Sequence, residues 1–371
     1  MVQGLDSSVK YRAEKVAQGS EALRRGGGEA AHASVPTDGL GTARRVPRGR
    51  GARPGPDQVL VRMAGAGLCR TDLHILASEP GFWPDPPFTL GHENAGWVAA
   101  SGTAVRGLAD GDGVLISSMY YCGHCDRCDR GRHESCRAVG LPGYGVGYDG
   151  GLADYILVEA RHAVPLGDLN PVLAAPLADA AATSYHAVGL VRTDLVPGTT
   201  AVVIGVGGLG GYAVQYLRLL TGTRVIAVDT APARLAEARR LGAHDTVISD
   251  GQTDDVIAEL TGGRGADAVL DLVGTTATLT TAVAAVAGGG RVVVAGIGGG
   301  AIPMGWERIA MNAGLLSTRG FNRGDLNEII GLARSGDIEI PATRFPFEEV
   351  PAALEALDSA QVNGRAVIEL T

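Results

Sequence analysis

The chain has 371 residues, a net charge of −8 and 45% hydrophobic residues. This length suggests about two domains, the hydrophobic content is enough for large cores, and the negative charge argues against nucleic acid as the main partner. The longest apolar run is too rich in glycine to be a membrane span, and the N-terminus lacks a signal-peptide core. We therefore expect a cytoplasmic protein, in which clustered cysteines bind metal more often than they form disulfides.

The first 55 residues differ in composition from the rest of the chain. They hold ten Lys or Arg and five Asp or Glu, and neither a helical nor a strand period persists in them. This pattern predicts a poorly ordered N-terminal extension. A transit peptide is the alternative, which the acidic residues and the lack of an amphipathic stripe disfavour.

From residue 57 the pattern is typical of short strands, beginning with 58–67 and continuing to about residue 165. An alanine-rich, helix-like stretch follows over 171–191. Beyond residue 199 apolar strands alternate with helices, which predicts a parallel sheet covered on both faces. The strands are expected at 200–205, 224–229, 244–249, 267–273 and 291–297, and the helices between them at 210–220 and 231–243. The tail predicts helices at 325–336 and 350–359 and a last strand at 365–370.

The segment GVGGLG predicts a dinucleotide site because it follows an apolar strand and opens a helix. Gly205, Gly207 and Gly210 fit the spacing that allows a tight turn, close approach of a pyrophosphate and close helix–strand packing. The next strand ends at Asp229, whose carboxylate can bind ribose hydroxyls and repel a 2′-phosphate, so NAD is favoured over NADP. Arg234 follows and can contact the same ribose. The alternative is a structural turn beside an exposed aspartate.

Four of the five cysteines lie within sixteen residues, in the pattern C-x2-C-x2-C-x7-C. Four thiolates suit a closed tetrahedral zinc site, which can stabilise a loop that lacks its own core. An iron–sulfur cluster is the main alternative, but the ferredoxin pattern has a shorter last gap followed by proline. His124 and His133 also lie in this loop, and we expect both to be solvated because the thiolates complete the shell. The four cysteines are Cys122, Cys125, Cys128 and Cys136.

Cys69 stands apart, and a lone cysteine is often a small buried hydrophobe. It precedes a GHE segment that supplies His92 and Glu93, and Asp72 can orient the histidine as an acceptor. A thiolate and an imidazole make two metal ligands. Asp179 is the candidate for a third, although the residue by itself favours the N-cap of the helix that follows.

These motifs together resemble the zinc-dependent medium-chain dehydrogenase/reductase family, the zinc alcohol dehydrogenases. CRTDLH, GHE, the four-cysteine loop, GGLADY, the LADA segment and GVGGLG occur in the family's order over about residues 55–371. The resemblance is greatest to bacterial NAD-dependent members whose third zinc ligand is aspartate. It implies an α/β protein with a GroES-like β-barrel catalytic domain and a Rossmann doubly wound parallel-sheet domain. The implied division is a GroES-like domain at 56–183 with its zinc loop at 121–137, a Rossmann domain at 184–320 and a C-terminal return at 321–371.

The resemblance also assigns roles to single residues. It implies that Cys69, His92 and Asp179 hold a catalytic zinc, with Glu93 as an exchange ligand, and that the four clustered cysteines hold a structural zinc. It implies that Thr71 and His74 relay the substrate proton, although a solvated surface histidine is the alternative for the second. The cofactor positions that it implies are Arg70, Gly205, Gly207, Gly208, Leu209, Gly210, Asp229, Arg234, Ile297 and Arg365.

The implied activity is reversible hydride transfer between a primary or secondary alcohol and NAD, in a homodimer or homotetramer. The alternatives are a polyol or sugar dehydrogenase, a biosynthetic ketone or alkene reductase, a zinc-free quinone reductase and an inactive dinucleotide-binding protein. The chain departs from the family in two places. The first barrel strand is replaced by ARRVPRGRGAR, and SSMYYC stands where relatives carry a Trp-containing segment, so that Ser118, Tyr120 and Tyr121 are expected to reshape the substrate pocket.

Overall fold

The structure, a computed structural model, describes residues 53–77, 88–140 and 142–370. The prediction for the N-terminal extension, and that for the replaced first strand, therefore lie outside the described residues, except for the last three positions of the extension. The chain divides into two compact units. The first comprises Met1–Asp179, Asn322–Arg334 and Ile340–Thr371, and the second comprises Ala180–Phe321 and Ser335–Glu339. Ser335–Glu339 belongs to the second unit although the resemblance placed it in the C-terminal return, and the implied domain boundaries remain predictions.

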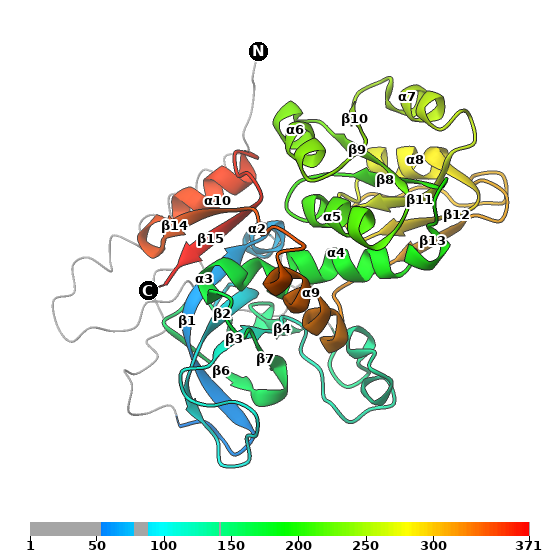
Figure 1. Cartoon of the computed structure of the whole chain (residues 1–371). Helices are drawn as coiled ribbons and strands as arrows, with labels where there is room; N and C mark the ends of the chain where they lie inside the picture. The colour runs from blue at the N-terminus through cyan, green and yellow to red at the C-terminus, as the bar shows by residue number, and fades with distance from the viewer. Residues whose placement is uncertain (1–52, 78–87, 141, 371) are drawn as a thin grey trace. The chain divides into compact units, whose positions relative to one another are not determined.

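The first unit is built on a seven-stranded, mainly antiparallel sheet (Figure 1). Its strand order is β14-β15-β1-β2-β3-β7, and β6 also pairs with β1. The long strand β1 carries the core because its alternate residues Val59, Val61 and Met63 are fully buried. The strands are β1 Gln58–Leu68, β2 Glu93–Ser101, β3 Gly113–Ile116, β6 Tyr155–Glu159, β7 Ala163–Pro165, β14 Ala342–Pro346 and β15 Arg365–Glu369, with the small pair β4 Gly143–Tyr144 and β5 Gly147–Tyr148 alongside.

Helices α2 and α10 cover one part of this sheet. Ile75 of α2 and Leu354 of α10 belong to one buried cluster with Leu68 of β1 and Ile368 of β15. This packing joins the C-terminal tail to the first described strand, as the resemblance implied. The helices of the unit are α2 Arg70–Ala77, α3 Pro171–Ala174, α9 Arg323–Ser335 and α10 Val350–Asp358.

The second unit is a six-stranded parallel sheet in the order β10-β9-β8-β11-β12-β13, with helices connecting most successive strands (Figure 1). It confirms the predicted parallel sheet. Its strands are β8 Thr200–Ile204, β9 Arg224–Asp229, β10 Asp245–Ile248, β11 Ala266–Asp271, β12 Val286–Val294 and β13 Gly314–Ser317. Its helices are α4 Ala180–Gly189, α5 Gly210–Leu220, α6 Pro232–Arg240, α7 Thr253–Leu260 and α8 Thr276–Ala285.

The strand order of the second unit reverses between β8 and β11. From β8 the chain runs outward through β9 to β10, and it then returns to β11 and continues through β12 to β13. In open parallel sheets, ligands bind beyond the carboxyl ends of the strands at such a reversal. None of the helices among the described residues is long and apolar enough to cross a membrane.

Candidate functional site

The ends of three neighbouring strands bring one group of polar side chains together in the first unit. Strand β1 pairs with β2 on one side and with β15 on the other, so that Gly67 lies opposite both Glu93 and Val367. Cys69 directly follows β1, His92 directly precedes β2, and Arg365 begins β15. Strand register alone therefore gathers residues that are far apart in the sequence.

Asp179 reaches this group from a break between two helices. It lies between a 3-10 turn, Ala175–Ala178, and the start of α4. Its carboxylate lies 3.5 Å from the Nε2 atom of His92. The side chain thus faces the imidazole, as a metal ligand would.

Four potential ligand atoms converge at this point. The sulfur of Cys69, a ring nitrogen of His92 and carboxylate oxygens of Glu93 and Asp179 all lie within 4.8 Å of one another. Ligands held about 2.0–2.3 Å from one tetrahedral zinc lie about 3.3–3.8 Å apart. The 3.5 Å between His92 and Asp179 falls in that range, so one thiolate, one imidazole and one carboxylate fit a zinc ion.

Asp72 fixes two of these ligands at once. One oxygen of its fully buried carboxylate accepts the backbone N–H of Cys69 at 2.8 Å. The other lies 3.2 Å from the Nδ1 atom of His92. A proton on Nδ1 would leave Nε2 free to bind a metal, which is the usual arrangement for a metal-binding histidine.

Glu93 is held by a second buried partner. Its carboxylate receives two hydrogen bonds from the guanidinium of Arg365, one from Nε to Oε2 at 3.2 Å and one from Nη2 to Oε1. Glu93 is fully buried and Arg365 is 4% exposed. The paired carboxylate therefore stands beside the other three groups while its charge is balanced by the arginine.

The electrostatics favour an ionised thiol at Cys69. Burial alone raises the pKa of Cys69, but Arg365 and His92 outweigh that effect and bring the pKa to about 7. Burial lowers the pKa of His92, but Asp72 and Asp179 hold it well above its usual value. Burial raises the pKa of Glu93, and Arg365 opposes that shift and favours the ionised carboxylate. A thiolate is the form of cysteine that binds metal.

Helix α2 carries three further predicted residues. The hydroxyl of Thr71 lies 3.7 Å from the sulfur of Cys69. His74 is three residues further along, on the same face of the helix, and is half-buried. Burial, with Arg70 nearby, lowers the pKa of His74 below its usual value. Arg70 itself is exposed.

The four clustered cysteines form a second group of converging ligands. Their sulfur atoms lie within 4.8 Å of one another, with separations of 3.6 Å from Cys125 to Cys128, 3.9 Å from Cys122 to Cys128 and 4.0 Å from Cys125 to Cys136. Thiolates at about 2.3 Å from one tetrahedral zinc lie about 3.8 Å apart. All four are free cysteines. This geometry fits the predicted structural zinc.

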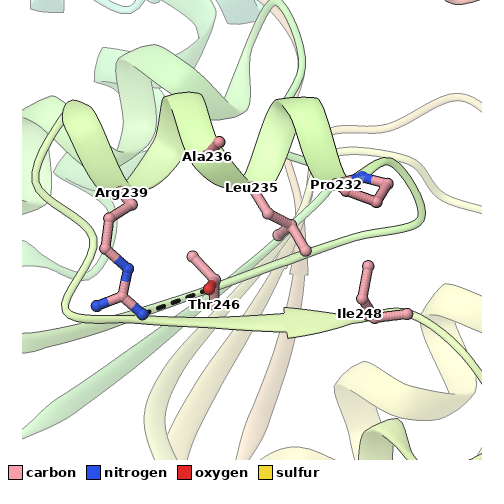
Figure 2. Close-up of a pocket in the computed structure, with 6 residues that line it drawn as sticks. All are labelled: Pro232, Leu235, Ala236, Arg239, Thr246 and Ile248. Atoms are coloured by element: carbon pink, nitrogen blue, oxygen red, sulfur yellow. Dashed lines mark hydrogen bonds between the residues drawn. The ribbon is translucent and has the colours of Figure 1, made fainter.

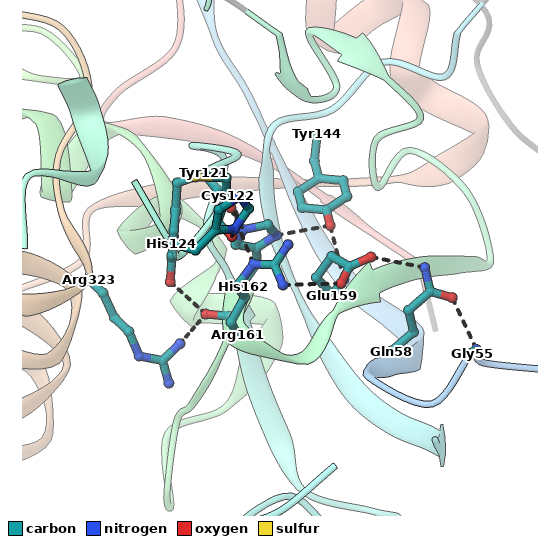
Figure 3. A network of polar contacts seen from close by, with 10 residues as sticks. All are labelled: Gly55, Gln58, Tyr121, Cys122, His124, Tyr144, Glu159, Arg161, His162 and Arg323. Carbon is teal, nitrogen blue, oxygen red and sulfur yellow. Dashed lines mark hydrogen bonds and ion pairs between the residues drawn. The ribbon is translucent and has the colours of Figure 1, made fainter. Parts of the chain in front are cut away.

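A polar network ties the cysteine loop to the sheet (Figure 3). His162 is fully buried, with Nε2 3.0 Å from the carbonyl oxygen of Tyr121 and Nδ1 3.1 Å from the hydroxyl of Tyr144. The hydroxyl of Tyr121 donates to the carbonyl of Arg161 at 2.7 Å, and Arg323 donates to the same carbonyl. Tyr121 directly precedes Cys122, so these contacts fix the start of the loop.

The expectation that His133 is solvated is wrong. Its ring stacks on Tyr121 with centroids 4.0 Å apart, and its Nδ1 atom accepts the backbone N–H of Arg323 at 3.1 Å. His124 is exposed, as expected.

Tyr120 and Tyr121 pack with His162 in this region. Ser118 instead donates to the carbonyl of Ala178 at 3.3 Å, one residue before Asp179.

The glycine-rich segment of the second unit forms the predicted turn between β8 and α5. Gly205 has a φ of +84°, which glycine adopts without strain, and a Cβ at Gly210 would lie 2.1 Å from the carbonyl oxygen of Gly205. Asp229 at the end of β9 accepts the N–H of Val206 at 2.9 Å, and Arg234 lies 3.7 Å from the same carboxylate. The carboxylate that we expect to bind ribose therefore also holds the glycine-rich turn.

The other predicted cofactor residues are distributed over both units. Gly207, Gly208 and Leu209 continue the glycine-rich turn, and Ile297 is 51% exposed after β12. Arg365 belongs to the first unit, where its guanidinium is engaged by Glu93. Its contact with a pyrophosphate remains a prediction.

The sequence analysis missed Ser184, whose hydroxyl donates to the carbonyl of Leu209 at 2.8 Å. This bond joins α4 to the glycine-rich turn. Ser184 is fully buried. A serine within an alanine-rich helical stretch was the only signal in the sequence.

A mostly apolar surface hollow between α6 and β10 does not belong to either group of functional residues (Figure 2). Its single charged residue, Arg239, donates to Thr246 at 3.4 Å and to the carbonyl of His244 at 2.8 Å. Strand β9 separates β10 from β8 and the glycine-rich turn. The hollow is lined by Pro232, Leu235, Ala236, Arg239, Thr246 and Ile248.

Comparison with known proteins agrees with this geometry. Residues 55–168 match the family described as "Alcohol dehydrogenase GroES-like domain", and residues 208–335 match "Zinc-binding dehydrogenase". The chain is 34% identical to an NAD-dependent alcohol dehydrogenase of Sulfolobus acidocaldarius, over 85% of this chain and 93% of that protein. It is 32% identical to a D-arabinose 1-dehydrogenase (NADP(+)) of Saccharolobus solfataricus, over 85% and 91%.

A solved structure extends the likeness to three dimensions. The alcohol dehydrogenase of Aeropyrum pernix superposes with a TM-score of 0.83 at 33% identity and covers 92% of this chain and 99% of its own. Both metal-ligand groups of the present chain lie in the unit that contains the GroES-like match. The chain belongs to the zinc-binding alcohol dehydrogenase family, a branch of the medium-chain dehydrogenases/reductases.

Proposed function

We propose that the protein is a zinc-dependent alcohol dehydrogenase that oxidises a primary or secondary alcohol with NAD and catalyses the reverse reduction. One observation carries the proposal. Ligands from three separate segments, the buried Cys69 and His92 and the partly buried Asp179, converge within 4.8 Å. Because Glu93 in the same group is paired with Arg365, three ligands remain to hold a catalytic zinc with one open position, the pattern of catalytic rather than structural sites.

The residues around this group have separable tasks. When bound, zinc supplies Lewis acidity toward the alcohol oxygen and the nicotinamide of NAD accepts the hydride. Thr71, whose hydroxyl is 3.7 Å from the Cys69 sulfur, accepts the proton of the substrate hydroxyl while it releases its own proton to the relay that ends at His74. His74 passes that proton toward solvent, a role that its half-buried position on the same helix face supports. The second zinc, in the four-cysteine loop, is structural.

The cofactor preference rests on Asp229. Its carboxylate lies at the end of β9, where a ribose hydroxyl is bound in dinucleotide domains, and it disfavours a 2′-phosphate. The carboxylate is 5% exposed and accepts backbone N–H groups from Val206 and Ala231. Its position is therefore fixed before any cofactor binds. Leu209 and Ile297 are proposed to contact the nicotinamide.

A sugar or polyol is the second candidate substrate class. The similarity to a D-arabinose 1-dehydrogenase supports it. Ser118 also supports it, because this small polar residue packs against the carbonyl of Ala178, next to Asp179, and leaves more room than a tryptophan would. We propose that Ser118 helps to set the size of accepted substrates.

We further propose that the protein forms a homodimer or homotetramer through the β13 edge. β13 is the last strand of the parallel sheet, and Leu315 and Leu316 on it are more than a third exposed. The preceding segment exposes Trp306 at 87% and Met311 at 73%. An apolar open edge of this kind is suited to pairing with a second copy.

The proposed compartment is the cytoplasm. All five cysteines are free, and both ligand groups need thiolates that stay reduced in order to bind metal. Cell fractionation that compares the location of the protein with that of a cytoplasmic marker protein would test this proposal. Recovery of the protein from an oxidising compartment would contradict it.

The test of the activity is formation of NADH from NAD with a panel of primary, secondary, aryl, polyol and sugar substrates. We expect turnover with at least one class, loss of turnover after zinc is removed by a chelator, and recovery when zinc is restored. Turnover that is unaffected by complete loss of zinc would contradict the proposal. Turnover with sugars alone would select the second candidate.

A further inference from the structure

Asp271 ends β11 at the point where the strand order of the second unit reverses. It is in register with Ile204, the last residue of β8, and with Val294, the last residue of β12. It therefore lies level with the beginning of the glycine-rich turn, and its side chain is fully buried. None of the sequence motifs assigned a role to it.

The carboxylate of Asp271 folds the backbone that follows β11 into a turn. A single oxygen, Oδ1, accepts the N–H groups of both Val273 and Gly274 at 2.9 Å. Gly274 has a φ of +74°, a conformation that this tight turn requires. The other oxygen, Oδ2, is buried and makes no hydrogen bond to the described residues. The turn therefore depends on one acceptor atom.

This turn contacts the glycine-rich segment directly. A Cβ placed on Gly205 would lie 2.4 Å from the Cγ2 atom of Val273. Since Asp271 fixes Val273, it also sets the surface against which the first glycine of the dinucleotide motif packs. On the opposite side, Asp229 holds the N–H of Val206.

The same turn also positions the GIGGG segment after β12. Gly298 donates its N–H to the carbonyl of Val273 at 2.9 Å, and Gly300 donates to the carbonyl of Gly274 at 2.8 Å. A Cβ on Gly298 would lie 2.6 Å from the Val273 oxygen, so this close approach requires glycine. The segment includes Ile297, which directly precedes Gly298 and is half exposed.

From these contacts we infer that Asp271 is a positioning residue for the nicotinamide half of the cofactor, acting through the turn 272–274 and the segment 296–300. This inference rests on the proposed function. A doubly wound sheet binds a dinucleotide as two mononucleotide halves, one on each side of the strand reversal. Asp229 on β9 marks the adenosine half, so β11, β12 and their turns take the other half.

Binding measurements on the full-length, zinc-loaded chain test the inference without relying on turnover. NADH affinity is measured by fluorescence titration, and AMP affinity by competition with NADH. Asp271→Ala should weaken NADH binding about tenfold and AMP binding by less than about twofold, because only the nicotinamide half loses its support. Asp271→Asn keeps Oδ1 and should stay within about threefold of the wild-type NADH affinity.

Asp267 provides a matched control at the other end of the same strand. Its carboxylate accepts the N–H of Thr200 at 2.7 Å, so Asp267→Ala removes a similar bond far from the turn and should leave both affinities unchanged. Gly298→Ala is an independent second variant for the case that Asp271→Ala does not fold. It should show the same selective loss of NADH affinity, whereas Gly305→Ala, where an added Cβ would lie 3.8 Å from Arg308, should not.

Three outcomes would overturn the inference. They are wild-type NADH affinity in Asp271→Ala or Gly298→Ala, equal losses for NADH and AMP, and an Asp271→Asn variant as weak as Asp271→Ala. A wild-type chain that does not bind NADH would overturn the proposed function itself, so the two failures are distinguishable.

Discussion

Arg365 and Glu93 are 272 residues apart in the chain, yet their charged groups form a doubly hydrogen-bonded pair in the interior. The strand pairings of β15 and β2 with β1 bring them together. The pair lies beside Cys69, and Arg365 lowers the pKa of that thiol against the effect of burial. One arginine thus balances a carboxylate and favours the thiolate at the proposed metal site.

Removing only one partner of this pair should lower the free energy of unfolding. Arg365→Leu leaves the carboxylate of Glu93 buried without its partner, which should lower the free energy of unfolding by about 3 kcal/mol. Glu93→Leu combined with Arg365→Leu should recover part of that loss, because neither charge then remains buried alone. Denaturant unfolding of the two single variants and the double variant gives the coupling free energy. Additive losses would show that the pair is not coupled.

Gly67 should be irreplaceable for a steric reason. A Cβ at this position would lie 2.0 Å from the Oε2 atom of Glu93. Gly67→Ala should therefore displace the carboxylate from Arg365 and lower the free energy of unfolding by about 2 kcal/mol. Gly331→Ala, in α9 where an added Cβ would meet no other part of the protein within 4 Å, is the control and should not destabilise. Equal unfolding midpoints for both variants would rule out the close approach.

His162 should make stability depend on pH. Burial lowers its folded pKa to about 3, against about 6.5 in the unfolded chain. The unfolded state therefore binds one more proton between these values, and stability falls as the pH drops below about 6.5, by up to about 1.4 kcal/mol per pH unit. His162→Gln should remove the contribution of one proton to the pH dependence of the free energy of unfolding, and so make the slope smaller. Unfolding measured from about pH 7.5 to 5.5 checks it, and parallel curves for the two proteins would refute it.

Asp229 should control both cofactor choice and the shape of the glycine-rich turn. Asp229→Asn removes the charge that disfavours a 2′-phosphate and should reduce the preference for NAD over NADP about tenfold. Because the amide nitrogen cannot accept the N–H of Val206 or Ala231, one of two hydrogen bonds is also lost. Stability should fall by about 1 kcal/mol. A variant with unchanged preference would remove Asp229 from cofactor recognition.

Local motifs made much of the site predictable from the sequence. Cys69 and His92 lie in short patterns that mark them as candidate ligands, and the four-cysteine loop contains all of its ligands within one segment. The alternation of strands and helices after residue 199 likewise predicted the parallel sheet. These features depend on neighbours within a few residues, so the sequence contains them directly.

Features that depend on distant pairing could not be predicted in this way. The Arg365–Glu93 pair needs the register of three strands, and the stacking of His133 on Tyr121 needs the fold of the loop. Strand β14, Ala342–Pro346, was missed because Pro341 precedes it and Pro346 is its last residue, and prolines disguise an edge strand. Strand β13 was missed because it is short and exposed.

Zinc content of single variants tests the central claim most directly. The wild type should hold two zinc ions per chain, one in each of its two ligand groups. Cys69→Ser should hold one zinc ion, lose turnover and still bind NADH, while Cys125→Ser should lose the other ion and, with it, the stability of the loop. If Cys69→Ser retains both ions and full turnover, Cys69, His92 and Asp179 are not the catalytic zinc ligands and the proposed mechanism is wrong.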